Sequence, residues 1–392
     1  MTAEAYLVRR NVNQPSSGKI SPPRLLGRLD MILTERCNNN CVHCYINLPS
    51  GDLDARKKEL STDEIKNILK EAVTLGCMMV RFSGGEPLLR EDFGELYLFA
   101  RRQGLKVAIF TNATCITPDL ADLFARIPPK EKIEITVYGM KQESYEAVTC
   151  VPGSFAKAWR GIHLLQERKV PFVVKGALLP DNKDDVDEFE AWAATIPWME
   201  KLPGYSMFFD LRCRREEGKN RSIMAVRATP ENGVKFMTRR KEEFLKDQKQ
   251  FCSQFMRPSG DKLFSCGSGK GGGCVDAYGG FQMCMMLLHP DTVYDLKQGT
   301  LQDALERSFP ACRNTTAVNK DYLQRCARCF LKGLCAQCPA KSWVEHGTLD
   351  TPVEYFCQVA HTQARFLGLI GEGEKAWEVV DAEQRIEKFV NS

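Results

Sequence analysis

The stretch from residue 29 to residue 45, LDMILTERCNNNCVHCY, joins a short apolar run to a loop rich in cysteine. Leu29–Leu33 is typical of a buried parallel β-strand, because strands covered on both faces are continuous apolar runs. Cys37, Cys41 and Cys44 follow it directly. In an α/β barrel, chemistry collects on the loops at the carboxyl ends of the strands, so this loop is a candidate active site.

Similar apolar runs recur along the first half of the chain, with amphipathic stretches between them. The further runs predicted as strands are Met78–Phe82, Lys106–Phe110, Ile133–Val137, Phe172–Leu179 and Met207–Leu211, and helices are predicted at Thr62–Leu75, Asp92–Gln103 and Phe155–Glu167. Alternation of strand and helix indicates right-handed βαβ units on a parallel sheet. We therefore expect an α/β fold, a partial (β/α)6 TIM-like barrel, with an ordinary doubly wound sheet as the alternative.

The alternation of apolar runs and amphipathic stretches ends after Leu211. Arg212–Asn220 is charged and loop-like, Lys235–Phe251 is predicted as a surface helix, and cysteines recur from Cys266 to Cys357 where signals for secondary structure are scarce. Such a region is typical of a small domain held by metal. Glu372–Val390 is predicted as an amphipathic helix that buries Trp377, Val380, Ile386 and Val390. The expected segments are an extension at 1–27, the barrel at 28–225, a cysteine-rich domain at 226–370 and a terminal helix at 371–392.

Composition excludes several classes of protein. The chain has 392 residues, 43% of them hydrophobic and 27% charged, which rules out disordered, collagen-like and coiled-coil proteins. The formal charge of +4 is too small for a dedicated nucleic-acid binder. No apolar run approaches the roughly 18–20 residues that span a bilayer, and Met1–Arg10 lacks a signal-peptide core. We expect a cytoplasmic protein without nucleic-acid or membrane partners.

Cysteine is unusually frequent. The chain has 17 cysteines and five histidines. An odd number prevents complete pairing into disulfides, and clustered thiols in a reducing compartment more often hold metal. Thiolate ligands favour zinc or iron–sulfur clusters. Three thiolates in a tight loop can hold three corners of a [4Fe–4S] cubane and leave the fourth iron open.

A second motif strengthens the iron–sulfur interpretation. The run Met78–Phe82 leads into Ser83-Gly84-Gly85-Glu86-Pro87, where the paired glycines let the backbone approach a ligand and the Glu86 carboxylate could accept a hydrogen bond from an ammonium group. Cys37-x3-Cys41-x2-Cys44 together with Gly84–Pro87 resembles the radical S-adenosylmethionine (SAM) enzymes. The resemblance covers about the first half of the chain.

The resemblance implies that Cys37, Cys41 and Cys44 hold a [4Fe–4S] cluster whose open iron chelates the amino and carboxylate groups of SAM. The reduced cluster then cleaves SAM to methionine and a 5′-deoxyadenosyl radical, which removes a hydrogen atom from the substrate. The residues that the resemblance assigns to SAM are His43 and Tyr45 by the adenine, Gly84, Gly85, Glu86 and Pro87 by the methionine amino group, Thr136 by the ribose, and Asn112 as a pocket liner. Asn112 equally suits a turn or a helix cap.

The C-terminal cysteines form a second pattern, Cys266-x12-Gly279-x4-Cys284 followed by Cys326-x2-Cys329-x5-Cys335-x2-Cys338 and Cys357. A pair of zinc sites is one interpretation, because two CxxC pairs also suit a zinc ribbon. Because the first half of the chain resembles radical SAM enzymes, a second interpretation is available. The pattern resembles the SPASM extension of those enzymes, which carries auxiliary [4Fe–4S] clusters. By that resemblance the first auxiliary cluster takes Cys266, Cys274, Cys284 and Cys338, and the second takes Cys326, Cys329, Cys335 and Cys357. Three clusters are then expected in total. The usual pattern ends Cys-x3-Cys, so one auxiliary cluster could be incomplete.

SPASM proteins mostly modify peptides and proteins, so the leading hypothesis is maturation of a ribosomally made precursor peptide by crosslinking, epimerisation or oxidation. The resemblance also implies an electron donor of the flavodoxin or ferredoxin type. Only some 28 residues precede the first predicted strand, too few for a winged-helix domain that binds a leader peptide. Leader recognition therefore falls to a separate protein or to the barrel itself.

Alternative functions stay open at this stage. A sulfatase-maturating activity is disfavoured because Met285 stands where that branch has an Asp base. Side-chain decarboxylation of a tetrapyrrole would use arginines at the barrel mouth, for which Arg81, Arg90 and Arg212 are candidates. A zinc-stapled scaffold without catalysis is the third alternative. Asp276 and Tyr278 are the candidates for a catalytic acid or base, although Asp276 also suits a turn cap.

Overall fold

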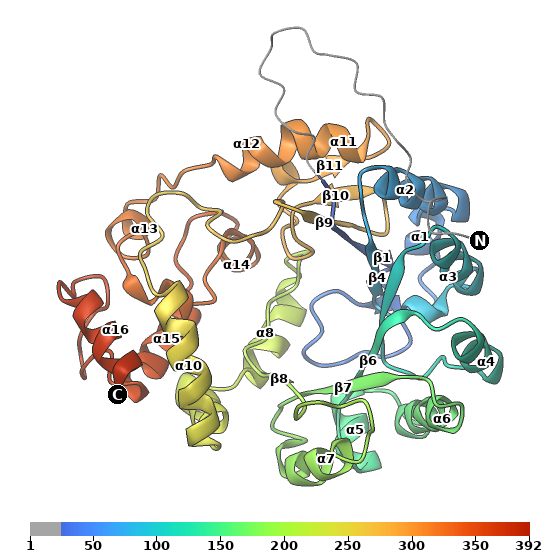
Figure 1. Cartoon of the computed structure of the whole chain (residues 1–392), viewed down its shortest axis with the longest axis horizontal. Helices are drawn as coiled ribbons and strands as arrows, with labels where there is room; N and C mark the ends of the chain where they lie inside the picture. Colours follow the sequence, from blue (N-terminus) through green and yellow to red (C-terminus); the bar gives the residue numbers. More distant parts are fainter. Residues whose placement is uncertain (1–24) are drawn as a thin grey trace, which may run out of the picture.

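The computed structural model describes residues 25–392 of the chain (Figure 1). Its centre is a sheet of nine strands in the order β11-β10-β9-β1-β4-β5-β6-β7-β8. All neighbours from β1 to β8 in that order pair in parallel. These strands are β1 (Arg28–Thr34), β4 (Met79–Gly84), β5 (Lys106–Thr111), β6 (Lys130–Val137), β7 (Phe172–Ala177) and β8 (Tyr205–Ser206). The predicted partial barrel is confirmed. The predicted N-terminal extension lies outside the described residues, apart from residues 25–27.

Amphipathic helices cover the outer face of this sheet, as Figure 1 shows for α2, α3, α4 and α6. The helices of the barrel are α1 (Leu53–Lys58), α2 (Thr62–Thr74), α3 (Phe93–Arg102), α4 (Pro118–Arg126), α5 (Gln142–Thr149), α6 (Ser154–Glu167) and α7 (Val186–Ala193). The three predicted helices match α2, α3 and α6 to within one residue at each end. In α2 the Ser61 side chain accepts from the Glu64 amide while the Glu64 carboxylate accepts from the Ser61 amide, so a capping box fixes where the helix begins.

The sixth predicted strand, Met207–Leu211, is wrong. The strand at this position is the two-residue β8, which pairs with Gly176 and Ala177 at the end of β7. Met207, Phe209 and Leu211 are buried alternately, and this alternation produced the prediction. Beyond Ala177, however, β7 has ended, so the backbone of 207–211 has no neighbouring strand to pair with.

The sheet continues past β1 into the C-terminal half of the chain. β9 (Gly272–Val275) pairs in parallel with β1, β10 (Gly280–Gln282) pairs antiparallel with β9, and the two-residue β11 (Tyr294–Asp295) follows. Sequence analysis did not predict these strands, because β9 lies in a glycine-rich stretch. Glycine is required there: a β-carbon on Gly273 would overlap the Phe281 ring.

The rest of the C-terminal half is mainly helical and lies beside the barrel (Figure 1). Its helices are α8 (Glu217–Val226), α9 (Pro230–Met237), α10 (Lys241–Phe255), α11 (Leu301–Asp303) with the π-helical Ala304–Ser308, α12 (Phe309–Arg313), α13 (Lys320–Gln324), α14 (Pro339–His346), α15 (Glu354–Phe366) and α16 (Ala382–Asn391). Short 3₁₀ turns occur at Pro87–Leu89, Lys183–Asp185, Pro290–Thr292 and Phe330–Gly333. The stretch predicted as a loop, Arg212–Asn220, already contains the first turn of α8. Among the described residues, no helix is long and apolar enough to cross a membrane.

Two predicted helices need correction. The span Lys235–Phe251 is broken between α9 and α10, where Arg240 pairs with Glu190 of α7 at 2.6 Å and draws the chain toward the barrel. The predicted terminal helix Glu372–Val390 begins only at Ala382. Gly373 has a positive φ of 75°, and Val380, predicted as buried, is 99% exposed.

One hydrophobic core runs through both halves of the molecule. It contains Phe82 and Phe172 from the barrel together with Phe281 of β10 and Phe309 of α12. A second, smaller core lies under α10, α15 and α16 and includes Cys252, Phe330 and Leu369. The sheet and the main core therefore join the two halves rather than separate them.

We expect Phe281→Ala to destabilise the whole protein. The ring is fully buried and its centroid lies 4.7 Å from that of Phe309, so truncation leaves a cavity that costs about 3–5 kcal/mol. Differential scanning calorimetry under anaerobic conditions should show one transition at a lower temperature, with the exposed Val380→Ala as control. An unchanged main transition would mean that β9–β11 fold independently of the barrel.

Candidate functional site

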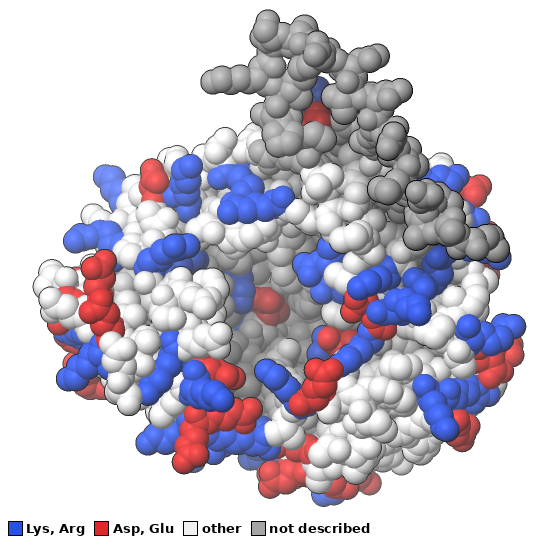
Figure 2. All heavy atoms as spheres, in the orientation of Figure 1, with Lys and Arg blue, Asp and Glu red and all other residues white. Residues whose placement is uncertain are grey.

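A large cavity opens at the carboxyl ends of the parallel strands, with about 1180 Å³ of space between the atoms of its walls and mouth. Residues from the cysteine loop and from the ends of β4, β5, β6, β7 and β8 line it. The same face of the molecule is hollowed between the barrel and the C-terminal half (Figure 2). This is the position at which a parallel α/β fold places its active site.

The predicted cysteine loop forms one wall of this cavity. Cys37, Cys41 and Cys44 all line it. The short strands β2 (Arg36–Cys37) and β3 (Leu48–Pro49) close the base of the loop. The buried Arg212 guanidinium fixes the loop from behind, because it donates to the carbonyl oxygens of Cys44, at 3.2 Å, and of Asn47, at 2.7 Å.

Hydrogen-bond donors point at the sulfur atoms of this loop. The Asn39 amide lies 3.4 Å from Cys37 Sγ, the Asn47 amide lies 3.4 Å from Cys44 Sγ, and Asn112 Nδ2 lies 3.7 Å from Cys37 Sγ. Such donors stabilise a thiolate more than a thiol. Burial raises the pKa of Cys37 to about 12, and it raises the pKa of Cys41 as well. A thiolate at these positions therefore needs a cation beside it, which a bound metal centre supplies.

The cysteines do not converge on a point. Among the described residues, the side chains of His, Cys, Asp and Glu form no group of three or more that could hold a single metal ion. A tetrahedral zinc site brings its sulfur ligands to about 2.3 Å from one ion. A cubane cluster instead accepts its thiolates at separate corners, so the three cysteines of the loop fit a cluster better than one zinc ion.

The glycine turn lies directly against the strand that leads into the cysteine loop. The Gly85 amide donates to the Thr34 carbonyl at 2.8 Å, and a β-carbon on Gly84 or Gly85 would overlap carbonyl oxygens of residues 34–36. Both positions therefore require glycine. Gly84, Gly85 and Ser83 line the cavity with their backbone exposed to it.

Glu86 does not face the cavity, which corrects the expectation that its carboxylate meets a ligand. The residue is fully buried. Its Oε1 accepts from the Leu88 amide at 3.1 Å and the Thr111 hydroxyl at 2.8 Å, and its Oε2 accepts from the Asn112 amide at 2.8 Å. These bonds tie the turn to the end of β5. Pro87 is likewise buried and starts a 3₁₀ turn outside the cavity.

The other residues predicted to contact a cofactor are all on the cavity wall: His43, Tyr45, Asn112 and Thr136. His43 lies with its ring centroid 4.6 Å from that of Phe209, and its buried Nδ1 has no hydrogen-bond partner. Burial lowers the pKa of His43 to about 4, so the imidazole is neutral at pH 7. Asn112 lines the cavity, as predicted. It also has the alternative role in a turn, because its Oδ1 accepts from the Thr114 amide.

The two acid–base candidates lie elsewhere. Asp276 Oδ1 accepts from the amides of Tyr278, at 2.9 Å, and Gly280, at 2.8 Å, so the carboxylate caps the turn between β9 and β10. The Tyr278 hydroxyl donates to the Glu35 carboxylate at 2.9 Å. Neither residue lines the cavity, and both are occupied in holding the loop structure.

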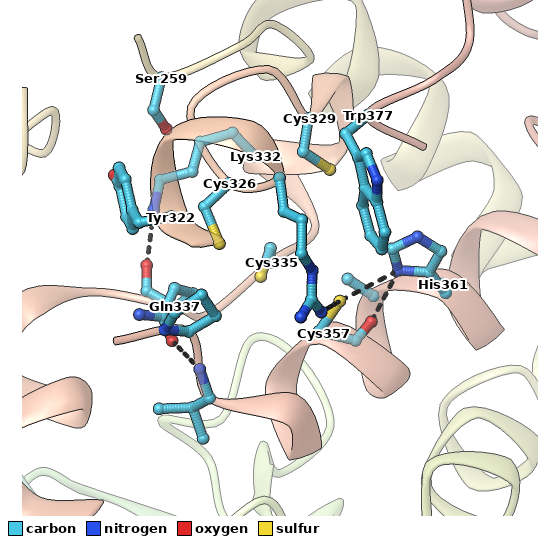
Figure 3. Close-up of a pocket in the computed structure, with 14 residues that line it drawn as sticks. Ser259, Tyr322, Cys326, Cys329, Lys332, Cys335, Gln337, Cys357, His361 and Trp377 are labelled. Carbon is cyan, nitrogen blue, oxygen red and sulfur yellow. Dashed lines mark hydrogen bonds between the residues drawn. The ribbon is translucent and has the colours of Figure 1, made fainter. Parts of the chain in front are cut away.

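A second, much smaller cavity lies in the C-terminal half, and its lining includes Cys326, Cys329, Cys335 and Cys357 (Figure 3). The structure therefore brings together all four cysteines predicted for the second auxiliary set. His361 and Trp377 stand at one side of the space in Figure 3. The Nε2 of His361 accepts from the Ala376 amide, so Nδ1 carries the proton. It donates to the Cys357 carbonyl at 2.9 Å, and Cys357 Sγ lies further away, at 3.6 Å.

The predicted first auxiliary set is only partly assembled. Cys266 and Cys338 line a separate cleft of about 1040 Å³. Burial raises the pKa of Cys284, and the thiols of Cys338 and Cys266 raise it further. Burial likewise raises the pKa of Cys274, to which the Cys284 thiol contributes. Cys274 lies instead in a small apolar cluster with Ile32 and Ile46, beneath the cysteine loop of the barrel.

Charged residues at the cavity were missed by sequence analysis. Asp210 and Lys175 line the wall but belong to no motif that marks them out. By contrast, the three arginines that were proposed to line the mouth of the barrel all have side chains that bind other residues of the protein. Arg90 pairs with Asp92 at 2.7 Å, Arg81 pairs with Asp30, and Arg212 holds the cysteine loop.

Comparison with known proteins identifies the first half of the chain. Residues 31–193 match the Radical SAM superfamily, and these residues include the cysteine loop, the glycine turn and Thr136. The chain therefore contains a radical SAM domain.

Two curated proteins are similar over the same region. The AdoMet-dependent heme synthase of Methanosarcina barkeri is 30% identical over 158 residues, which are 39% of this chain and 43% of that protein. The mycofactocin maturase MftC of Mycolicibacterium smegmatis is 36% identical over 167 residues, which are 41% of this chain and 40% of that protein. The similarity thus spans less than half of either relative.

A solved structure resembles nearly the whole chain. It is native anSMEcpe with bound AdoMet and the Cp18Cys peptide, with a TM-score of 0.60, 17% sequence identity, and coverage of 94% of this chain and 99% of that one. At this identity the likeness shows the fold alone, which includes the C-terminal half as well as the barrel.

We expect Glu86 to make the stability of the protein depend on pH. Burial raises the pKa of Glu86 to about 7, above the value of 4.5 for an exposed carboxyl group. The folded state therefore holds this proton more tightly than the unfolded chain, and its stabilising contribution is lost as pH rises through about 7. Between pH 5.5 and 8 the wild type should lose about 2 kcal/mol that Glu86→Gln does not lose, measured by urea unfolding of both proteins. Parallel pH profiles would contradict this assignment.

Proposed function

We propose that this chain is a radical SAM enzyme that modifies a ribosomally made peptide by removing a hydrogen atom from it. The proposal rests first on one observation: the three cysteines of the loop and the Gly84–Gly85 turn line the same cavity at the carboxyl edge of the barrel. The radical SAM domain over residues 31–193 supports it.

In this proposal Cys37, Cys41 and Cys44 each bind one iron of a [4Fe–4S] cluster, and the fourth iron stays open toward the cavity. The amides of Asn39 and Asn47 and the side chain of Asn112 stabilise the thiolates. When bound, the cluster and SAM supply a 5′-deoxyadenosyl radical as the hydrogen acceptor. The backbone of Gly84 and Gly85 receives the methionine end, the Thr136 hydroxyl contacts the ribose, and His43 and Tyr45 pack by the adenine. Glu86 and Pro87 hold the turn in shape.

The C-terminal half is proposed to be a SPASM domain with two auxiliary [4Fe–4S] clusters. Cys326, Cys329, Cys335 and Cys357 form the better supported ligand set, because all four line one cavity. The other set is Cys266, Cys274, Cys284 and Cys338, of which Cys274 fits least, given its place in an apolar cluster. The proposed division of the chain is 28–225 for the core, 226–370 for the SPASM domain and 371–392 for the C-terminal segment.

Two observations support a peptide as the substrate. The cavity is wide, with about 1180 Å³ of space that includes its open mouth. In addition, one relative is a mycofactocin maturase, and the solved structure of similar fold contains a bound peptide. A separate leader-binding protein and an electron donor of the flavodoxin or ferredoxin type complete the proposed set of partners.

Tetrapyrrole side-chain decarboxylation is the second candidate, because similarity to a heme synthase favours it. The three arginines proposed to bind the carboxylates of a porphyrin already have partners within the protein. These are Arg81, Arg90 and Arg212. A zinc-stapled scaffold is less supported still, because the described residues offer no group of ligands for a single ion.

We expect the anaerobically reconstituted protein to contain about 12 irons and as many sulfides per chain, as three cubane clusters require. Cys37→Ser should lose about four of the irons and all SAM cleavage, measured as 5′-deoxyadenosine. Cys77→Ser is the matched control, because the buried Cys77 thiol only donates to the Met79 carbonyl at 3.2 Å, and serine can do the same. Zinc with little iron would reject the enzyme and favour the scaffold.

We also expect anaerobic co-expression with the short open reading frames of the same operon to change the mass of one encoded peptide. Oxidation or crosslinking removes hydrogen, and epimerisation in D₂O introduces deuterium, so mass spectrometry reports either. The competing experiment is titration of the purified protein with an iron porphyrin. A Soret shift at stoichiometric porphyrin, with all peptides unmodified, would favour the tetrapyrrole reaction instead.

A further inference from the structure

The large cavity has an unusual distribution of charge. Among the described residues that line it, Asp210 is the only carboxylate and Lys175 the only cation. Lys175 is already paired with Glu134 and lies 4.6 Å from the centroid of the Phe110 ring. The remainder of the wall consists of apolar, small polar and cysteine side chains. Any proton that leaves a substrate in this cavity therefore has one carboxylate side chain on the wall as a candidate acceptor.

Asp210 is held at the side of the cavity that faces the C-terminal half. It follows β8 by four residues and stands between the buried Phe209 and Leu211, which fix the backbone. Its side chain is 26% exposed and pairs with Lys341 Nζ at 2.9 Å. The paired oxygen, Oδ1, is buried and accepts no hydrogen bond of good geometry, so its contact with the Lys341 ammonium group is an ion pair.

Lys341 links this carboxylate to the proposed auxiliary cysteines. It lies in the first turn of α14, the helix that begins directly after Cys338. Its ammonium group also lies 3.7 Å from the centroid of the Phe356 ring, so the side chain is confined between Asp210 and α15. A single helix thus carries both the partner of Asp210 and, at its N-cap, a proposed cluster ligand.

We propose that Asp210 is the general base of the reaction and that Lys341 positions it. This inference rests on the proposed function and names the group that the sequence motifs left unassigned. Loss of a hydrogen atom leaves an unpaired electron on a substrate carbon that bears an adjacent N–H, O–H or S–H bond. That bond would then break and its proton would go to the Asp210 carboxylate, while one electron would leave for a one-electron oxidant, the chemistry that an auxiliary [4Fe–4S] cluster would supply when bound. The product gains a double bond between carbon and the heteroatom, so the substrate is oxidised by two electrons overall.

Lys341 has a separate role in this scheme. Its ammonium group holds one oxygen of the Asp210 side chain in place through the 2.9 Å ion pair. The cluster ligand Cys338 lies at the other end of the same helical turn. The proton and the electron therefore leave the substrate toward the same side of the cavity.

The test uses the full-length, reconstituted protein with the peptide that co-expression identifies by its mass change. Asp210→Asn keeps the shape of the side chain and removes the base. We expect product formation to fall by about 10²–10⁴-fold, while iron content and the first burst of 5′-deoxyadenosine stay within about twofold of wild type. Freeze-quench EPR should then detect a radical on the peptide that the wild type does not accumulate.

Matched variants separate this role from a structural one. Asp210→Glu should recover product formation, and Lys341→Arg should be closer to wild type than Lys341→Met. Glu91→Gln is the control, because it breaks the exposed 2.9 Å ion pair between Arg56 and Glu91, and neither residue lines the cavity.

Three results would overturn the assignment. Normal product formation by Asp210→Asn means that another group takes the proton. A raised KM with unchanged kcat means that Asp210 binds the substrate instead. If the wild type modifies none of the peptides, the proposed function fails and the assignment falls with it, whereas failure in Asp210→Asn alone leaves that function intact.

Discussion

The close contact between two backbone segments determines the shape of the cavity. The Gly84–Gly85 turn lies against the carbonyl groups of residues 34–36, where no side chain has room. The buried Glu86 carboxylate then ties this turn to the end of β5 through two hydrogen bonds, and a third comes from Leu88 within the following 3₁₀ turn. Because the cysteine loop starts where this contact ends, the contact sets the distance between the loop and the opposite wall. The most buried carboxylate of the region is thus structural, although its motif suggested a ligand.

The C-terminal half contributes to the cavity through ordinary secondary structure. β9 adds to the free edge of β1, and Phe281 packs into the same core as the barrel residues. From the opposite side, α14 supplies Lys341, which pairs with Asp210 on the cavity wall. The residues that line the cavity all lie between Cys37 and Asp210, so the C-terminal half supports this wall from outside it.

Much of the barrel and of the first cysteine loop could be predicted from the sequence, because continuous apolar runs and closely spaced cysteines are local signals. Five of the six predicted strands and all three barrel helices lie where the patterns indicated. Met207–Leu211 failed because alternate burial does not guarantee a pairing partner. β9 was missed because its glycines carry no strand signal, and only the distant Phe281 explains them. Asp210 could not be found either, since its role depends on Lys341, 131 residues further along the chain.

The pairing of β9 with β1 has a consequence for charge movement through the molecule. Four residues of each strand are in register, from Arg28 opposite Gly272 to Met31 opposite Val275, and no linker separates them. The strand that leads into the cysteine loop and the strand that leads toward Cys284 are therefore parts of one rigid sheet. If both halves held the proposed clusters, an electron passing between them would cross a gap whose width is set when the chain folds, and its rate would not wait for a hinge to close.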